Sequence, residues 1–313
     1  MIFMISVVVP AFNEEESLEK FYSVLIPALL KLGSYEIVFV DDGSTDSSLD
    51  LMKKIAVKNK NVRIFSFRKN QGKAEALTLG FKMAKGDYIV TLDADLQDRP
   101  EEIKKLLEKL KEGFDLVSGW RKNRKDSLKT RLSSQLFNFI MSAFWGVHLH
   151  DYNCGLKAYT KEAAKSLNLY GGMHRFIPLL AAGMGFEVTE VPVVHEKRKY
   201  GKSKYGFSKI FKDVPDMLTI LFLTRFAKRP LHFFGFIGGV VSFTGFIILL
   251  YLYILRLMGQ TIGTRPLLTF GILLVLAGFQ VLFTGFLADL ILHISSQGGN
   301  TNNEEDRLKY KTE

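Results

Sequence analysis

Two long stretches without a charged side chain, close to the carboxyl terminus, constrain this chain more than any other feature of its sequence. One lies between Arg229 and Arg256, and the other lies between Arg265 and Asp289. Each exceeds the roughly 20 residues that a helix needs to cross the hydrocarbon core of a bilayer. Buried helices of soluble proteins are the alternative, but they are usually shorter. We therefore expect a two-helix transmembrane region over residues 230–294.

The segments on either side of this region have different compositions. Residues 206–229 alternate apolar side chains with Lys and Asp and contain Pro215, which is typical of amphipathic helices in the membrane interface. An amphipathic helix packed on the preceding domain is the alternative. Residues 295–313 are rich in Gly, Asn and charge, and this composition predicts a disordered cytoplasmic tail.

Basic residues are unevenly distributed along the chain. The 313 residues carry 42 Lys and Arg against 32 Asp and Glu, a net charge of +10. Basic groups occur within residues 121–131, 197–204 and 225–229. The last group directly precedes the first span, which is typical of the cytoplasmic side and of contact with anionic membrane lipids. No nucleic-acid-binding motif accompanies the charge, so we expect no nucleic-acid partner.

The amino terminus and the single cysteine bear on location. Residues 1–10 are apolar but lack a basic start, and Asn13–Glu16 stand where a signal peptide would have its cleavage site. We therefore expect residues 1–205 to be a cytoplasmic domain of an integral protein of the cytoplasmic membrane, with both termini cytoplasmic. Cys154 is the only cysteine, which excludes an internal disulfide and a site with several cysteine ligands.

Strand-like and helix-like patterns alternate over the first 120 residues. The short apolar runs are residues 6–10, 36–40, 62–66, 87–92 and 116–118. The stretches with helical spacing are residues 14–31, 51–57, 73–83 and 100–111. This alternation predicts an α/β fold with a Rossmann-like, mostly parallel sheet that helices cover on both faces.

Polar residues follow three of the predicted strands. The pairs are Asn13 and Glu14, Asp41 and Asp42, and Asp93 and Asp95. Ligands of such sheets bind at the carboxyl ends of the strands, so these pairs indicate one polar site at that edge. A carboxylate at Asp42 suits a ribose or a base, but it also suits the turn of an Asp-Gly-Ser sequence.

Asp93-Ala94-Asp95 is the candidate metal site. In an extended segment residues two apart point to the same side. Asp93 and Asp95, together with Gln97, are then expected to present oxygen atoms to one divalent cation. An all-oxygen site suits Mg²⁺ or Mn²⁺. The alternative for a lone Asp-x-Asp is a solvated turn.

Several motifs occur in the order in which family 2 glycosyltransferases carry them. The first four are Val-Pro-Ala-Phe-Asn-Glu at 9–14, Asp-Asp-Gly-Ser at 41–44, Asn-Gln-Gly-Lys at 70–73 and Leu-Asp-Ala-Asp-Leu-Gln-Asp at 92–98. The later ones are Asp-Tyr-Asn-Cys-Gly-Leu-Lys at 151–157, His-Arg-Phe-Ile-Pro at 174–178 and Arg-Lys-Tyr-Gly-Lys-Ser-Lys-Tyr at 198–205. Over residues 4–230 the chain thus resembles this family, which has the A-type glycosyltransferase fold. Within it the chain is similar to the branch of dolichol-phosphate mannosyltransferases and undecaprenyl-phosphate glucosyltransferases.

The resemblance implies an activity and a set of roles. The activity is a metal-dependent, inverting transfer of a hexose from UDP-glucose or GDP-mannose to a polyprenyl phosphate, for glycan assembly, by a homo-oligomer. The nucleotide-sugar would lie against Pro10, Asn13, Glu14, Asp42 and Lys73, and the metal against Asp93, Asp95 and Gln97. The lipid phosphate would meet Arg121, Arg131 and Ser134, and a closing loop would contribute Arg198, Ser203 and Lys204.

The acceptor chemistry needs cations more than it needs a base. A phosphate monoester has a second pKa near 6, so at neutral pH it is already largely dianionic. Arg121 and Arg131 would neutralise and aim it. Asp151 is expected either to act as a base or only to orient a basic residue or a sugar hydroxyl. Lys157 departs from the family, which often has Arg there, and a lysine keeps the charge but loses the planar fork.

Three other functions compete with this interpretation. A processive polysaccharide synthase typically carries a Gln-x-x-Arg-Trp motif, and neither Trp120 nor Trp145 lies in one. A membrane-tethered transferase with a soluble or saccharide acceptor would not need basic clusters that face the bilayer. A non-catalytic lipid-translocation partner is expected to have lost the Asp-x-Asp or nucleotide motifs, and both are intact here.

Overall fold

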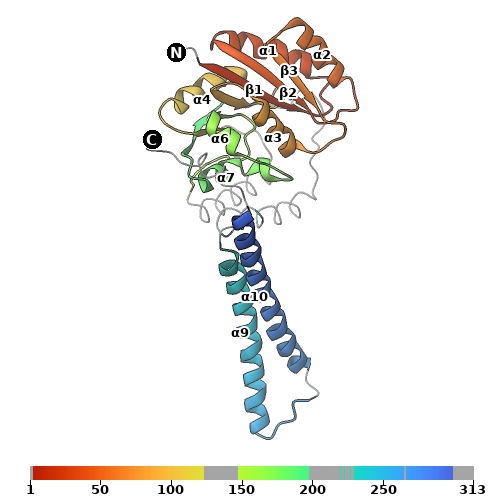
Figure 1. Cartoon of the computed structure of the whole chain (residues 1–313), viewed down its shortest axis with the longest axis vertical. Helices are drawn as coiled ribbons and strands as arrows, with labels where there is room; N and C mark the ends of the chain where they lie inside the picture. Colours follow the sequence, from red (N-terminus) through yellow and green to blue (C-terminus); the bar gives the residue numbers. More distant parts are fainter. Residues whose placement is uncertain are drawn as a thin grey trace. The chain divides into compact units, whose positions relative to one another are not determined.

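The computed structural model describes residues 3–122, 147–196, 219, 222, 226, 229–263 and 266–298. The chain divides into two compact units, Met1–Ile220 and Leu221–Glu313. Each unit is described by itself below. Figure 1 shows the helices and strands of both.

The first unit is built on a mixed sheet whose seven described strands lie in the order β3-β2-β1-β4-β6-β5-β7. β1 pairs in parallel with β2 and β4, and β2 pairs in parallel with β3. β6 runs antiparallel to both β4 and β5. The strands are β1 (Met4–Ala11), β2 (Ser34–Asp41), β3 (Val62–Ser66), β4 (Tyr88–Thr91), β5 (Leu116–Trp120), β6 (Lys157–Thr160) and β7 (Val188–Pro192).

Helices cover the two faces of this sheet (Figure 1). Successive β1 side chains alternate between two apolar clusters, with Val7 and Val9 in one and Val8 in the other, as the two-residue period of a strand requires. The first cluster contains α1 (Leu18–Leu30), α2 (Ser48–Lys58) and α4 (Ile103–Leu110), which follows the short η1 (Pro100–Glu102). The second contains α3 (Lys73–Met83), α6 (Lys161–Ser166) and α7 (Ile177–Gly183), which follows η2 (Met173–Arg175).

The antiparallel strand β6 changes what lies at the binding edge of the sheet. Lys157, its first residue, is paired with Thr91 at the end of β4 and with Ser118 of β5. The amino end of β6 therefore lies beside the carboxyl ends of the parallel strands. This places Gly155 and Lys157 at the edge where the sequence predicts only residues that follow strands.

The predicted α/β class and the mostly parallel sheet are confirmed. β3 and α3 have the predicted bounds, and β1, β2, α2 and β5 extend the predicted segments by a few residues. The predicted helix at 14–31 begins only at Leu18. β6, β7, α6 and α7 were not predicted. β4 ends at Thr91, and residues 94–95 form a turn. The prediction of an extended segment over Asp93–Asp95 is therefore wrong.

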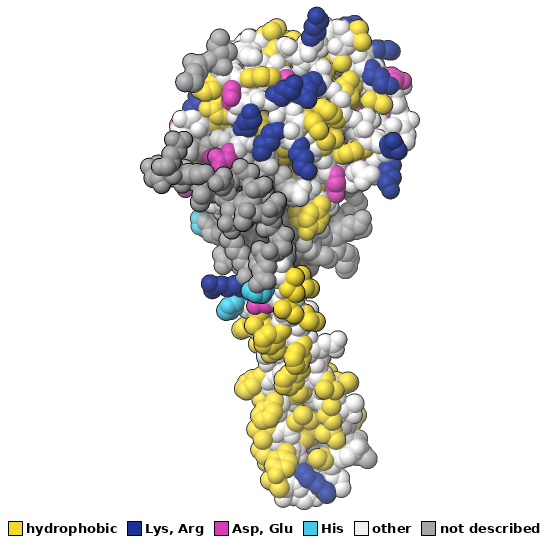
Figure 2. All heavy atoms as spheres, viewed as in Figure 1, with side chains coloured by type: hydrophobic (Ala, Val, Ile, Leu, Met, Phe, Trp, Pro, Cys, Tyr) yellow, Lys and Arg dark blue, Asp and Glu magenta, His cyan; other side chains and the backbone are white. Residues whose placement is uncertain are grey.

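The second unit consists, in its described part, of α9 (Pro230–Leu257) and α10 (Pro266–Gly298). The two helices pack closely at glycines: a Cβ on Gly278 would lie 2.5 Å from the carbonyl oxygen of Gly238 and 2.2 Å from Ser242 Oγ. Small residues let helix backbones approach in this way in membranes. Outward-facing side chains such as Phe236 and Phe243 are 74% and 64% exposed, and Figure 2 shows hydrophobic side chains along the visible face of the pair.

Both helices are long and apolar enough to cross a membrane. The prediction of two C-terminal apolar helices that could span a bilayer is therefore confirmed. Most of the predicted interfacial segment 206–229, and the predicted tail from residue 299 onward, lie outside the described residues.

Candidate active site

The loops that follow β1 and β2 are joined by hydrogen bonds. Asn13 has φ 53°, a left-handed backbone conformation that asparagine tolerates. Its backbone N donates to Ser44 Oγ at 3.0 Å, and its Oδ1 accepts from the backbone N of Thr45 at 2.8 Å. The backbone N of Glu14 donates to Ser48 Oγ at 2.8 Å. Asn13 and Glu14 are thereby fixed next to the loop that carries Asp42.

Asp42 is buried and organises the loop before α3. Its carboxylate accepts hydrogen bonds from the backbone N of Gln71 at 2.7 Å, from the backbone N of Gly72 at 3.0 Å and from Asn70 Nδ2 at 2.9 Å. Burial raises the pKa of Asp42, and the hydrogen bonds from Gln71 and Gly72 offset that rise only in part. The carboxylate thus holds the loop that leads into α3, which begins at Lys73.

Lys73 and Asp93 form the central ion pair of this edge. Lys73 Nζ lies 2.6 Å from Asp93 Oδ1 and 2.7 Å from Oδ2. The two side chains keep about a third of their surface, 32% and 31%. Burial by itself would raise the pKa of Asp93, but the ammonium of Lys73 outweighs it and the pKa lies below the ordinary value. Asp93 therefore stays ionised at neutral pH.

The turn after Asp93 places Asp95 and Gln97 differently from the sequence prediction. Leu96 has φ 60°, and the backbone N of Gln97 donates to Asp95 Oδ1 at 3.1 Å. Gln97 Nε2 lies 3.4 Å from His195 Nε2, and His195 Nδ1 lies 3.0 Å from an oxygen of Asp98. The Gln97 side chain thus contacts an imidazole whose presence here no sequence pattern indicates.

The oxygen ligands at this edge fit a divalent cation whose coordination would be completed by substrate phosphates. Asp93 and Asp95 offer carboxylate oxygens, and the ammonium of Lys73 already lies where Asp93 would meet a cation. Within the part of the chain that the structure describes, no three His, Cys, Asp or Glu side chains gather as a metal cluster. Mg²⁺ is commonly held by one or two carboxylates with substrate phosphates supplying the rest, so two are enough.

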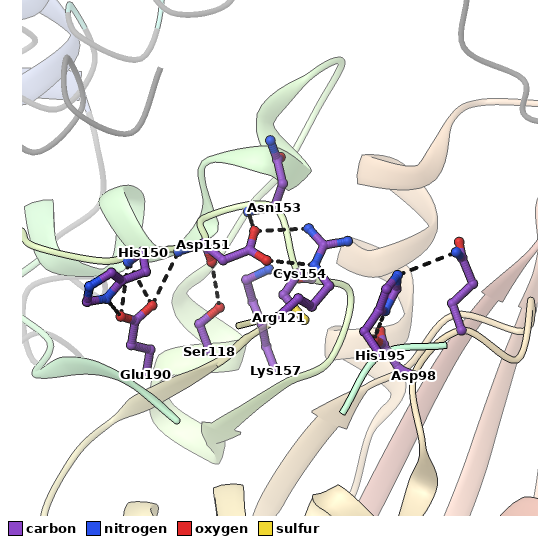
Figure 3. Close-up of polar contacts among 11 residues, drawn as sticks. Asp98, Ser118, Arg121, His150, Asp151, Asn153, Cys154, Lys157, Glu190 and His195 are labelled. Atoms are coloured by element: carbon purple, nitrogen blue, oxygen red, sulfur yellow. Dashed lines mark hydrogen bonds and ion pairs between the residues drawn. The ribbon is translucent and has the colours of Figure 1, made fainter. Parts of the chain in front are cut away.

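Arg121 and Asp151 form a second, more deeply buried ion pair (Figure 3). Arg121 Nε lies 2.6 Å from Asp151 Oδ2 and its Nη2 lies 2.9 Å from Oδ1. The side chains are only 12% and 5% exposed. Burial opposes the charge on Arg121, but Asp151 more than compensates and the pKa of the guanidinium is raised. A planar fork on a carboxylate has a fixed orientation, so Asp151 aims Arg121.

A carboxylate of β7 holds the segment that carries Asp151. The backbone N of His150 donates to Glu190 at 3.0 and 2.9 Å, and the backbone N of Asp151 donates to it at 3.3 Å. The His150 ring contacts the same carboxylate and stacks on Trp120 with centroids 4.1 Å apart. Figure 3 shows Glu190 beneath this segment, opposite Arg121. His150 and Glu190 were missed by the sequence analysis.

Lys157 is a buried cation between the two ion pairs. It is 3% exposed, its Nζ donates to the carbonyl oxygen of Cys154, and burial lowers its pKa to about 8. Its charge acts on Asp93, and that of Arg121 acts on it. Gly155 lets the chain pass directly against Asp93, since a Cβ there would lie 2.6 Å from Asp93 Oδ2.

His174 is a neutral neighbour of the same edge. Burial, followed by the charges of Lys73 and Arg175, lowers the pKa of His174 to about 3. Its Nδ1 is buried without a hydrogen-bond partner among the described residues. The imidazole is therefore uncharged at neutral pH.

The structure brings together part of the predicted site. Pro10 lies in β1, in register with Val40 of β2. The described residues at or beside the binding edge are Pro10, Asn13, Glu14, Asp42, Lys73, Asp93, Asp95, Gln97, Arg121 and Asp151. The predicted residues Arg131, Ser134, Arg198, Ser203 and Lys204 lie outside the described residues.

Comparison with known proteins identifies relatives over almost the whole chain. A dodecaprenyl-phosphate galacturonate synthase of Rhizobium johnstonii is 39% identical over 294 residues, covering 92% of this chain and 87% of the relative. An undecaprenyl-phosphate 4-deoxy-4-formamido-L-arabinose transferase of Pseudomonas aeruginosa is 35% identical over 292 residues, covering 92% and 85%. Both relatives carry polyprenyl-phosphate sugar transfer in their names.

Solved structures share the fold at lower identity. Glucosyl-3-phosphoglycerate synthase of Mycobacterium tuberculosis, in complex with Mn²⁺ and UDP-glucose, has a TM-score of 0.54 and 22% identity. The match covers 71% of this chain and 79% of that one. At this identity the likeness establishes the fold alone.

The sheet order, the acidic residues at its edge and these relatives define an enzyme of the glycosyltransferase class. Residues 6–167 match the Glycosyl transferase family 2. The chain belongs to this family, and the expectation drawn from its motifs is confirmed.

Proposed function

We propose that this enzyme transfers a sugar from a nucleotide-sugar to a polyprenyl phosphate at the cytoplasmic face of the membrane. The observation that carries the proposal is the pair of relatives named for polyprenyl-phosphate sugars, which match 92% of the chain. The chain also has two helices that are long and apolar enough to cross a membrane. Those helices would keep the enzyme in the membrane that contains a lipid-linked acceptor, and the phosphate of such an acceptor lies at the membrane surface.

Donor binding is assigned to the loops after β1 and β2 and to the start of α3. Pro10, Asn13, Glu14 and Asp42 line this part of the edge and Lys73 closes it. Asp42 is already engaged by the amides before α3, so its part is to shape the pocket wall. The nucleotide would then be contacted by neighbouring groups that Asp42 helps to position, and not by Asp42 itself.

Asp93 and Asp95 would hold Mg²⁺ or Mn²⁺, with Gln97 as the third proposed ligand. The metal would supply positive charge to the nucleoside diphosphate as the sugar–phosphate bond breaks. Asp93 is ready for this role because its pKa lies below the ordinary value. To reach the metal, Gln97 would use its amide oxygen, since its Nε2 lies 3.4 Å from His195 Nε2.

The acceptor phosphate is assigned to Arg121. Its guanidinium is held by two hydrogen bonds to Asp151 and keeps further N–H groups for a phosphate oxygen. Arg131, Ser134, Arg198, Ser203 and Lys204 are proposed to complete this contact. An oxygen of the acceptor phosphate attacks the anomeric carbon, the bond to the nucleoside diphosphate breaks, and the anomeric centre inverts. Asp151 orients Arg121 and takes no proton.

The relatives widen the set of candidate donor sugars. UDP-glucose and GDP-mannose were the donors expected from the motifs, whereas the relatives are named for galacturonate and 4-deoxy-4-formamido-L-arabinose. The donor panel therefore contains the UDP derivatives of glucose, galacturonate and 4-deoxy-4-formamido-L-arabinose, and GDP-mannose. We further propose a homo-oligomer with both termini cytoplasmic, a catalytic domain over residues 1–205 and contact with anionic lipids.

The full chain in nanodiscs, with Mn²⁺ or Mg²⁺, tests the proposal. Each radiolabelled donor is incubated with and without undecaprenyl phosphate, and label is measured in the organic phase. Label that depends on the lipid phosphate and on one of the donors supports the function. Label that appears only in water-soluble products would show a soluble acceptor, and no transfer from any donor would refute the proposal.

A further inference from the structure

We infer that Lys73 takes the place of a divalent cation on Asp93 in the donor-free enzyme, and that its ammonium moves to the donor diphosphate when metal and nucleotide bind. The inference rests on the metal-dependent transfer proposed above. Its starting observation is that Lys73 Nζ lies within 2.7 Å of both oxygens of Asp93. A single ammonium thus lies within hydrogen-bond distance of both oxygens of the carboxylate that is the first proposed metal ligand.

The backbone just before Lys73 is held by hydrogen bonds, so the movement we propose is confined to the Lys73 side chain. Lys73 is the first residue of α3, and the two amides before it, those of Gln71 and Gly72, are held by the buried carboxylate of Asp42 at 2.7 and 3.0 Å. A lysine ammonium is a point charge on a flexible four-carbon stem. The side chain can therefore exchange one anion for another while its anchor stays in place.

Asp93 keeps about a third of its side-chain surface, 31%, but the backbone restricts it on one side. The chain at Gly155 lies directly against it, since a Cβ at that residue would be 2.6 Å from Asp93 Oδ2. An ammonium and a divalent ion on one carboxylate would also repel each other strongly at such distances. Metal binding therefore has to displace Lys73 from Asp93.

Lys157 is a second cation beside Asp93 and Lys73, and its positive charge opposes that of Lys73. Once a metal ion has displaced Lys73 from Asp93, the negative charge of a nucleoside diphosphate would stabilise the ammonium. Metal and nucleotide should then strengthen each other's binding by the same factor, because such coupling is reciprocal.

Mn²⁺ binding measures the exchange without relying on catalysis. Free Mn²⁺ is followed by electron paramagnetic resonance during titration of the full chain in detergent at pH 7, alone, with UDP and with GDP. We expect Lys73→Met to bind Mn²⁺ alone on the order of fivefold to tenfold more tightly than the unmodified chain. The same variant should bind nucleotide more weakly and gain less Mn²⁺ affinity from it.

Matched variants separate this effect from a general change of charge. Lys73→Arg keeps a cation on Asp93, so its affinity for Mn²⁺ alone should stay close to that of the unmodified chain. Lys53→Met removes an exposed lysine of α2 that pairs with Asp50, and it should leave Mn²⁺ binding unchanged. Circular dichroism and gel filtration check folding, and Lys73→Gln replaces Lys73→Met if that variant is not recovered folded.

The outcomes distinguish the inference from the function beneath it. The exchange is supported if Lys73→Met binds Mn²⁺ more tightly than the unmodified chain and the two control variants do not. Unchanged or weaker binding, while the unmodified chain binds Mn²⁺ with a nucleotide, overturns the exchange and leaves the metal site standing. If the unmodified chain binds no Mn²⁺ with either nucleotide, the metal assignment fails and the exchange fails with it.

Discussion

Glu190 of β7 receives the backbone N–H of His150 on both of its carboxylate oxygens, at 3.0 and 2.9 Å. The neighbouring amide of Asp151 reaches the same carboxylate at 3.3 Å. Glu190 is therefore a positioning residue: it holds the segment that holds Asp151, and Asp151 in turn holds Arg121 at 2.6 Å.

The first prediction concerns this chain of contacts. Glu190→Gln keeps one acceptor oxygen but replaces the other with an N–H₂ group that opposes the amide of His150. We expect kcat/KM for the lipid acceptor to fall about tenfold, because small misplacements of an aiming group cost rate. The affinity for the nucleotide should not change. Steady-state kinetics with varied acceptor, and UDP or GDP titration, measure the two effects.

Glu187 offers a matched control, since its side chain is exposed just before the same strand. Glu187→Gln should leave both parameters unchanged. A loss of nucleotide affinity in Glu190→Gln equal to its loss of acceptor turnover would argue against a role through Arg121.

The second prediction concerns the buried pair itself. Asp151→Asn leaves the guanidinium of Arg121 buried without its anion, and removing one partner of such a pair costs about 3 kcal/mol. Transfer should fall as well, because the fork loses one of its two charged acceptors. The double variant Asp151→Asn with Arg121→Met should recover most of the stability and none of the activity. Denaturant unfolding in detergent and the transfer assay measure both, and recovery of activity in the double variant would contradict the role of Arg121.

The strands and loops that place this site could be predicted from the sequence, because they follow from local patterns. Asp42 and Asp93 come directly after strands whose apolar runs are visible in the sequence, and parallel strands bring their carboxyl ends to one edge. The helix over residues 73–83 was predicted from its helical spacing, and α3 has these bounds.

The finer contacts depend on tertiary placement that no local pattern contains. β6 has four residues, and only its pairing with β4 and β5 brings Lys157 to the binding edge. Glu190 lies 40 residues from His150, and Lys73 lies 20 from Asp93. The Asp93–Asp95 prediction assumed an extended chain, whereas Leu96 at φ 60° belongs to a turn. The contacts between the site residues were therefore less predictable from the sequence than the identity of those residues.

The third prediction is a pH dependence of stability that comes from Lys157. Burial lowers the pKa of Lys157 to about 8, below the ordinary 10.5. Between these values the unfolded chain binds more protons than the folded one, so the free energy of unfolding rises as pH rises from about 8 toward 10.5. The full contribution is about 3 kcal/mol, at 1.36 kcal/mol for each pKa unit. Below pH 8 the cost of the buried charge is fully present.

Lys157→Met removes this contribution. Its free energy of unfolding relative to the unmodified chain should therefore decline by a similar amount across the same pH window. Intrinsic fluorescence during denaturant unfolding in detergent measures it, with the exposed-lysine variant Lys53→Met as a control. Curves for Lys157→Met and the unmodified chain that stay parallel would show that Lys157 keeps an ordinary pKa.

The fourth prediction concerns Asp95. Asp95→Asn keeps an oxygen that can accept from the backbone N of Gln97, now 3.1 Å from the carboxylate, so the turn should survive. It loses the negative charge that a divalent cation requires. Transfer should fall by about a hundredfold or more at 1 mM Mn²⁺ or Mg²⁺. Asp50→Asn, at an exposed position, is the control, and unchanged transfer by Asp95→Asn would refute the metal assignment.

The last prediction tests the packing of α9 against α10. A Cβ on Gly278 would lie 2.5 Å from the carbonyl oxygen of Gly238, which is backbone and cannot move aside, whereas a Cβ on Gly239 would meet nothing within 4 Å. Gly278→Val should therefore separate the helices and lower the thermal midpoint of the full chain in detergent by several degrees, while Gly239→Val should not. Because both variants add the same side chain to a long apolar helix, equal midpoints would show that close approach at Gly278 does not hold the pair together.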